Sequence, residues 1–255
     1  MGKGRRICYY QSYSEDFVRS GNQGFQLSDG YQWIVPRRRW AQVLYGLLCA
    51  VGWLYCKIAL HVSIKNQAVL KDYRGCGYFL YGNHTQPIGD VFLPALVSWP
   101  QKMVVIASPA NLGIPFIGRL LPYLGALPTT DTVTGVKKLR EAVLHYVEQK
   151  HCVVIFPEGH VWPYCTLIRP FSPAAFYFPA VTGAPSFCLS ATYQKRRLGK
   201  KPKLTLYVDG PFFPKAGFTR KEQQAQLRAE IFDCMKRRSQ RSNYAYIRYE
   251  RREGV

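Results

Sequence analysis

Five short apolar runs rich in Val, Ile and Phe constrain the fold of this chain more than any other feature. Runs of this length and composition, bounded by turn residues, are typical of buried β-strands. Between the second and third runs, apolar residues from Val136 to Val147 recur at helical spacing and predict a helix over 135–150. Strands that alternate with helices predict an α/β fold, a mostly parallel sheet flanked by helices. The five runs lie at residues 78–81, 103–107, 152–156, 186–192 and 204–208.

The remaining segments suggest four parts. Residues 1–36 are polar, basic and rich in Tyr, and we expect a loosely attached N-terminal arm. A membrane-associating helix is expected within 37–66, and the α/β domain within 67–215. Residues 216–255 are expected to form a helix with Thr219 as its N-cap, followed by a basic tail. A chain of 255 residues is long enough for one sizeable domain of this kind.

The apolar stretch from Trp40 to Val62 follows three consecutive arginines. Its length is about the ~20 residues that a membrane span needs. Lys and Arg are also abundant after the stretch, so the charge distribution does not orient a span. We expect a helix that lies in or dips into the headgroup layer of a membrane. A helix buried in the protein core is the alternative.

The formal net charge of +20 predicts an anionic partner. A nucleic acid, an anionic membrane surface or a phosphorylated substrate would each satisfy it. The eight cysteines form no C-x-x-C pair, and no His has zinc-finger spacing, which argues against a structural zinc site. With no secretory signal, we expect reduced thiols and a location at the cytoplasmic face of the cell membrane.

The first candidate site is the segment Asn83–Asp90, which reads NHTQPIGD and directly follows the first apolar run. A His at the end of a strand is a usual place for a catalytic group in an open α/β sheet. Pro87 is expected to begin a helix, with Asp90 in its first turn. Asp90 could then fold back on His84, fix the imidazole tautomer and make it a general base for a hydroxyl proton. Alternatively, His84 bonds a turn and Asp90 only starts the helix.

Three further segments carry candidate residues. Arg119 ends an apolar turn that starts at Gly113, where a guanidinium could bind phosphate. The third apolar run leads into Pro157–Gly159, which places the Glu158 carboxylate at the same sheet edge as His84 and lets a ligand approach the backbone closely at Gly159. Pro185 starts the fourth run and could shape an acyl channel. Taken singly, each residue has a simpler interpretation: Arg119 is a surface Arg, Glu158 is a loop acid, and Pro185 is a structural Pro.

Together, in this order and spacing, the segments resemble the glycerolipid acyltransferase family, which includes lysophosphatidic acid and glycerol-3-phosphate acyltransferases. The resemblance covers roughly residues 75 to 212. The matching segments are Asn83–Asp90, Gly113–Arg119, Leu121–Ala126 with Asp131 beyond, Phe156–Gly159 and the run after Pro185.

The resemblance implies a reaction and a role for each matching residue. His84 would act as base on an acceptor hydroxyl, which attacks the thioester of acyl-CoA or acyl-carrier protein, and Asp90 would orient His84. Arg119, Glu158 and Gly159 would form the substrate-binding site for the phosphate-bearing acceptor, and Pro185 would belong to acyl-donor binding. The resemblance implies no metal and no cofactor besides the acyl donor as co-substrate.

Two departures from the family pattern stand out. The family usually has four residues between the His and the Asp, whereas five separate His84 from Asp90. The family commonly continues Glu-Gly with Thr-Arg-Ser, whereas residues 160–162 here read HVW. Either another cation such as Arg169 reaches the phosphate, or the acceptor differs from lysophosphatidic acid.

The expected function is therefore acyl transfer to lysophosphatidic acid or a related glycerophospholipid precursor in phospholipid biosynthesis. The expected partners are membrane lipids, the acyl donor and the lipid acceptor, and no nucleic acid. A non-enzymatic binder that uses the basic, Tyr-rich segment 237–252 is a second hypothesis, although no recognised nucleic-acid module is present. A third is a catalytically silent, lipid-binding relative, which the longer spacing between His84 and Asp90 would explain.

Overall fold

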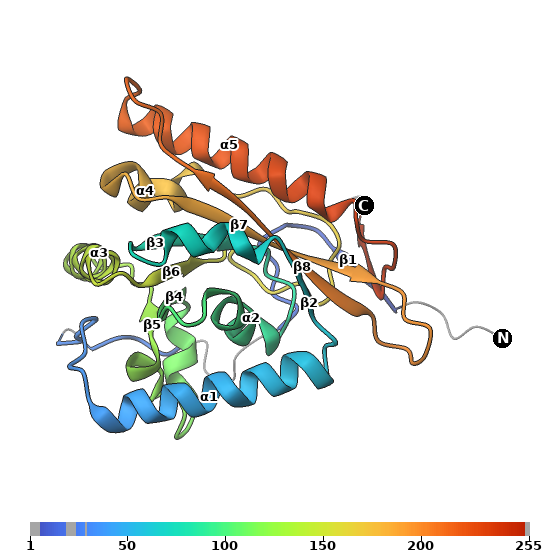
Figure 1. Ribbon diagram of the computed structural model, residues 1–255, viewed down its shortest axis with the longest axis horizontal. Helices are drawn as coiled ribbons and strands as arrows, with labels where there is room; N and C mark the ends of the chain where they lie inside the picture. Colours follow the sequence, from blue (N-terminus) through green and yellow to red (C-terminus); the bar gives the residue numbers. More distant parts are fainter. Residues whose placement is uncertain (1–5, 19–23, 29, 253–255) are drawn as a thin grey trace.

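The computed structural model describes residues 6–18, 24–28 and 30–252. Seven strands form the central sheet: β2 Ser63–Lys65, β3 Tyr78–Gly82, β4 Met103–Ala107, β5 Ala126–Pro128, β6 Cys152–Ile155, β7 Ser186–Gln194 and β8 Lys203–Phe212. Their order is β2-β8-β7-β3-β6-β4-β5 (Figure 1). Only the pair β7–β8 is antiparallel among these neighbours. The predicted fold class, a mostly parallel sheet flanked by helices, is confirmed.

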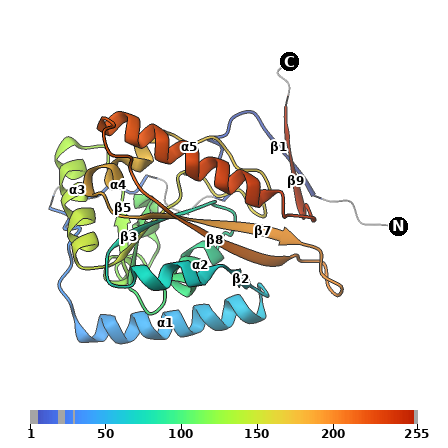
Figure 2. The same cartoon turned by 45° about the horizontal axis from the view of Figure 1, so that its top comes forward.

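Helices cover both faces of this sheet (Figures 1 and 2). The helix pair α1 (Arg39–Ile58) and α2 (Gly89–Ser98) covers one face. Three helices cover the other face: α3 (Val133–Glu148), α4 (Tyr177–Thr182) and α5 (Arg220–Ser239). Short 3-10 helices complete the chain at η1 Gln67–Tyr73, η2 Pro109–Gly113, η3 Leu121–Leu124 and η4 Pro173–Phe176.

The central strand β3 shows why the apolar runs predicted strands. Tyr78 and Leu80 are buried in the cluster on the α1–α2 face, and Phe79 and Tyr81 in the cluster on the α3–α5 face. Successive side chains of a strand point to opposite faces. A strand that is covered on both faces is therefore apolar at every position, without alternation.

Side-chain caps mark the starts of α3 and α5. Thr219 caps α5 as predicted: its hydroxyl accepts from the Glu222 N–H, and the Glu222 carboxylate accepts from the Thr219 N–H. The prediction that Pro87 begins a helix is wrong. Pro87 and Ile88 form a turn, and α2 starts at Gly89. Asp90 still lies in the first turn of α2.

Part of the N-terminal segment packs closely on the domain. Strand β1 (Arg6–Tyr10) pairs in parallel with β9 (Ile247–Arg251), and the two strands bury Trp162 from a loop beyond β6. Trp33 is buried in the cluster on the α3–α5 face of the sheet, and its indole N–H donates to the carbonyl of Pro128 at 2.8 Å. The expectation of a loosely attached arm is wrong for these residues, because their aromatic side chains are buried. Residues 1–5, 19–23 and 29 of that arm, and 253–255 of the expected tail, lie outside the described residues.

Within the described chain, α1 is long and apolar enough by length and composition to cross a membrane. Only Ala41, Gly52 and Cys56 of this helix are buried, so α1 is not a core helix. Gly52 lies against the Phe92 ring of α2, where a β-carbon would collide with that ring. The outer face of α1 exposes a stripe of large apolar side chains: Trp40, Val43, Leu47, Val51, Leu54 and Ile58.

Candidate active site

The loop that carries His84 is fixed to the neighbouring strand β7. The Asn83 side chain exchanges two hydrogen bonds with the backbone of Ala191: its Nδ2 donates to the carbonyl at 3.1 Å and its Oδ1 accepts from the N–H at 2.7 Å. The Tyr193 hydroxyl accepts from Nε2 of Gln86 at 2.9 Å and lies 2.7 Å from Oγ1 of Thr85. These buried bonds hold the loop at the carboxyl edge of the sheet, the rigid support that a catalytic side chain requires.

The imidazole of His84 contacts the carboxylate of Asp90. Nδ1 of His84 lies 2.7 Å from Oδ2 of Asp90, which also accepts from the Gln86 N–H at 2.9 Å. An ionised carboxylate only accepts, so the imidazole proton resides on Nδ1 and Nε2 keeps its lone pair. Burial raises the pKa of Asp90, although the hydrogen bond from His84 acts in the opposite direction. The additional residue of the sequence spacing is accommodated in the turn before α2.

Aromatic packing sets the plane of the His84 ring. It stacks on Phe156, with ring centroids 4.4 Å apart and planes 18° apart. Gly82 makes room for Phe156, since a β-carbon at that position would lie 2.7 Å from its ring. The His84 side chain remains 21% exposed. No hydrogen bond from another described residue uses its Nε2, so that nitrogen is left for a substrate.

Both oxygens of the Glu158 carboxylate accept hydrogen bonds from other residues of the protein. One oxygen accepts from the backbone N–H of His84 at 3.1 Å and from Nη2 of Arg169 at 2.8 Å, and the other accepts from the backbone N–H of Arg169 at 2.8 Å. Both side chains of this ion pair are 1% exposed. The Arg169 guanidinium also donates to the carbonyl of His160 and lies over the Trp162 ring, 4.7 Å from its centroid. Arg169 therefore neutralises Glu158, and the suggestion that it reaches a substrate phosphate does not fit its burial.

The segment after Glu158 runs beside the His84 loop. Gly159 adopts the left-handed conformation with φ of 76°, and open space surrounds the position of a β-carbon. Nδ1 of His160 lies 2.7 Å from Oδ1 of Asp16, and each side chain is about one third exposed. The N–H of Trp162 donates to the carbonyl of His84 at 3.0 Å. Residues 160–162, where the family commonly has Thr-Arg-Ser, therefore have two structural effects. Trp162 supports the His84 loop, and His160 forms a second His–Asp pair with Asp16.

Arg119 and Pro185 lie apart from this group. Arg119 is exposed in the connection between β4 and β5, and within the described ranges it has no hydrogen-bond or ion-pair partner. Pro185 is buried just before β7, and its carbonyl accepts from the Phe79 N–H at 2.9 Å. That position is the amino edge of the sheet, a strand length from His84. The structure thus brings together His84, Asp90, Glu158 and Gly159, but neither Arg119 nor Pro185 contacts them.

Tyr193 is the supporting residue that the sequence reasoning missed. The predicted run ended at residue 192, whereas β7 continues to Gln194. The Tyr193 side chain is buried and its hydroxyl reaches back to the His84 loop. The sequence does not distinguish a Tyr that ends a strand and bonds a distant loop from any other Tyr in an apolar run.

A possible metal-ligand group lies elsewhere in the described chain. Cys188, Asp209 and Cys234 place their ligand atoms within 4.8 Å of one another between β7, β8 and α5. Asp209 already accepts from Nε of Arg238 at 2.8 Å and from its Nη2 at 2.5 Å. This bidentate pair occupies the carboxylate, so the group gives no reason to assign a metal.

No protein-family model matches the sequence, and no curated protein matches it either. Among solved structures, the crystal structure of the 1-acyl-sn-glycerophosphate acyltransferase from Thermotoga maritima is similar to this chain. The two superpose with a TM-score of 0.58 at 18% sequence identity, over 82% of this chain and 84% of that one. At this identity the similarity shows a shared fold. It agrees with the resemblance that the ordered sequence segments suggested.

Proposed function

We propose that this protein is a membrane-associated glycerolipid acyltransferase, which transfers a fatty acyl group from a thioester to a hydroxyl of a phosphate-bearing lipid precursor. The observation that carries the proposal is the 2.7 Å contact between Nδ1 of His84 and Asp90 at the carboxyl edge of the sheet. This edge is where open α/β sheets place their ligands. The shared fold with a known acyltransferase supports the same assignment.

In the proposed reaction His84 is the general base. Its Nε2 takes the proton of the acceptor hydroxyl while the hydroxyl oxygen forms a bond to the thioester carbonyl carbon. Asp90 stabilises the imidazolium that results. When the tetrahedral intermediate collapses, the carbon–sulfur bond breaks and the thiolate leaves; His84 returns its proton to the thiolate or to solvent, which regenerates the base. A silent relative was suggested by the longer sequence spacing, but the spacing does not separate the His84 and Asp90 side chains.

The remaining site residues take distinct roles in this proposal. Arg119, exposed and without a protein partner in the described chain, is suited to bind an acceptor phosphate. Glu158 positions the backbone of His84, and Gly159 leaves room for the acceptor. Pro185 lies at the opposite edge of the sheet from His84, so its effect on the acyl donor would be indirect, through the position of β7. Lysophosphatidic acid or a related glycerophospholipid is the proposed acceptor, and acyl-CoA or acyl-carrier protein the proposed donor, with no further cofactor.

The exposed apolar face of α1 supports the membrane part of the proposal. Burying several such side chains in lipid stabilises attachment by about 1.5–3 kcal/mol each when burial is complete. The net charge of +20 favours an anionic leaflet, such as the cytoplasmic face of a cell membrane.

Acyl transfer by the purified full chain in detergent tests the function. Labelled acyl-CoA and acyl-carrier protein are offered with glycerol 3-phosphate and a panel of lysophospholipids. The His84→Ala variant should lose ~10²–10⁴-fold in rate, the usual contribution of a general base. The exposed His61 gives a matched control, and His61→Ala should retain activity. Absence of transfer to every acceptor by folded wild-type protein would contradict the proposal.

A further inference from the structure

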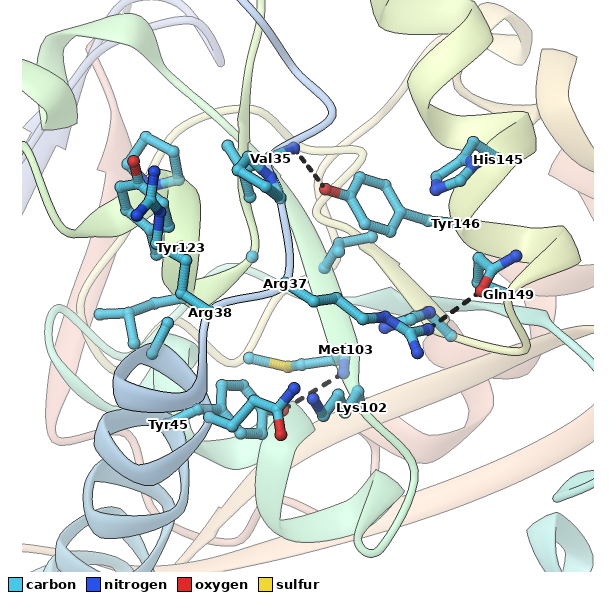
Figure 3. A pocket seen from close by; sticks show the side chains of 18 residues that line it. Val35, Arg37, Arg38, Tyr45, Lys102, Met103, Tyr123, His145, Tyr146 and Gln149 are labelled. Carbon is cyan, nitrogen blue, oxygen red and sulfur yellow. Dashed lines mark hydrogen bonds between the residues drawn. The ribbon is translucent and has the colours of Figure 1, made fainter.

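A cavity lies at the opposite edge of the sheet from His84. It is enclosed by the segment that leads into α1, the start of β4, the helix η3 and the end of α3 (Figure 3). Its volume is about 100 Å³, several times what one bound water molecule needs. The proposed acyltransferase site uses none of the residues that line it.

Basic side chains line this cavity without acidic ones. Arg37, Arg38, Lys102, His145 and His151 are among its lining residues, and none of the others is Asp or Glu. Figure 3 shows Arg37 extended across the cavity toward Gln149, to which its Nη2 donates at 2.9 Å. That acceptor is a neutral amide, so the lining residues supply no negative charge to balance these basic side chains.

The ring of His151 is incompletely satisfied there. Its Nδ1 is buried and has no hydrogen-bond partner among the described residues. Burial, with Lys102 and Arg37 as further causes, lowers the pKa of His151. A bound anion would accept a hydrogen bond from the cavity and would offset the repulsion among these groups.

Elements with exposed apolar side chains flank the cavity. Arg37 and Arg38 immediately precede α1, whose outer face is apolar and exposed. The ring of Trp40 at the start of α1 packs on Tyr123 of η3, with centroids 5.0 Å apart. The connection before η3 exposes further apolar side chains, and Phe116 is 92% exposed. A headgroup in the cavity could therefore leave its acyl chains beside α1.

We infer that this cavity binds a phosphate group, and that the group belongs to an anionic membrane lipid. Arginine and lysine together offer the several hydrogen-bond donors that phosphate oxygens accept. The adjacent apolar face of α1 favours a lipid over a soluble phosphate ester. The lining residues do not include His84, Asp90 or Arg119, so the inference does not depend on catalysis.

The first arm of the test measures binding of the full chain to vesicles of phosphatidylcholine with and without phosphatidylglycerol. The Arg37→Gln/Lys102→Gln variant should bind the anionic vesicles about tenfold or more weakly, as expected for two basic residues that face an anionic surface. Arg220→Gln/Lys221→Gln on α5 removes the same charge from exposed positions elsewhere. Equal loss in the two double variants would overturn the lipid assignment.

The second arm titrates inorganic phosphate and follows the ring signals of His145 and His151 by NMR. Saturable shifts in wild type that vanish in the cavity variant would support a phosphate site. No shift, together with equal vesicle binding of the two double variants, would overturn the whole inference. Shifts with equal vesicle binding would assign the cavity to a soluble phosphate and overturn the lipid part. Lys102 is exposed, so Lys102→Gln alone serves if the double variant fails to fold.

Discussion

The backbone N–H of His84 donates to the carboxylate of Glu158, 3.1 Å away, and so connects the ends of the adjacent strands β3 and β6. The same carboxylate holds the buried guanidinium of Arg169. A residue that the family resemblance assigns to acceptor binding is thus bonded on both oxygens within the protein. In the proposed reaction the contribution of Glu158 is to position the base His84, with the Glu158–Arg169 ion pair as the rigid element.

Glu158→Gln should lower the free energy of unfolding by about 3–5 kcal/mol, because it leaves the buried Arg169 charge uncompensated. Chemical denaturation in urea measures the change. The double variant Glu158→Gln/Arg169→Met should recover part of it. Lys215→Met, which breaks the exposed pair with Glu230, should cost little. Equal stability of wild type and Glu158→Gln would contradict the buried pair.

Asp90→Asn should reduce the acyl-transfer rate by ~10²–10⁴-fold, as expected when a general base loses its correct protonation state. An amide at this position can donate to Nδ1 and would favour the proton on Nε2, where the lone pair is needed. The effect should appear in kcat rather than in KM. Asp72 is exposed, and Asp72→Asn should be neutral. Full turnover by Asp90→Asn would remove Asp90 from the mechanism.

Tyr193→Phe should weaken support of the His84 loop while leaving the ring packing in place. Loss of the hydroxyl leaves the buried polar groups of Thr85 and Gln86 without their partner, at a cost of about 1–3 kcal/mol. Thermal unfolding measures the stability, and kcat should fall because the loop carries the base. Tyr9 is about half exposed, and Tyr9→Phe should change neither. If Tyr193→Phe kept the wild-type kcat, the hydrogen bonds of the Tyr193 hydroxyl would not contribute to catalysis.

His151 should contribute to acid destabilisation. Its pKa is lower in the folded protein than its ordinary value of 6.5, so the unfolded chain binds more protons between those two values. The free energy of unfolding therefore falls as pH drops through that window and rises as pH increases. In His151→Gln this part of the pH dependence should disappear, whereas His61→Gln should retain it. Parallel urea midpoints of wild type and His151→Gln across about pH 5 to 7 would refute this.

Leu47→Glu/Val51→Glu should reduce binding to lipid vesicles by at least about tenfold, since burial of each apolar side chain is worth about 1.5–3 kcal/mol. Both positions are exposed on the outer face of α1, so thermal stability should be unchanged. Ala216→Glu/Ala225→Glu adds the same two charges at exposed positions in and before α5 and serves as the control. Undiminished sedimentation with vesicles would show that α1 does not face the membrane.

The sequence was sufficient to predict the elements whose structure depends on residues close together in the chain. Strand β3 is apolar at every position because both of its faces are covered, and α5 starts where Thr219 and Glu222 can form a capping box. The juxtaposition of His84 and Asp90 also follows from short-range geometry. Six positions of separation, a turn and a helix start suffice to bring the two side chains into contact.

Other features depend on contacts between distant segments, which local patterns do not encode. The pairing of β1 with β9 joins two polar, basic segments whose inward aromatic residues become apparent only when Trp162 lies between them. Pro185 directly precedes β7, the strand that carries Ala191 and Tyr193, but the direction of β7 places it at the opposite edge from His84. A strand's direction is a property of the whole sheet, so the sequence could not assign that position.

Arg6 lies opposite Ile247 in the β1–β9 ladder, so this contact joins residues that leave the ribosome far apart in time. Strand β1 has no partner until β9 has been translated. Until then Trp162 lacks the cover of Tyr249, which stacks on it at 4.9 Å between ring centroids. Because the Trp162 N–H supports the carbonyl of His84, the loop that carries the proposed base is completed only after β9 has been translated.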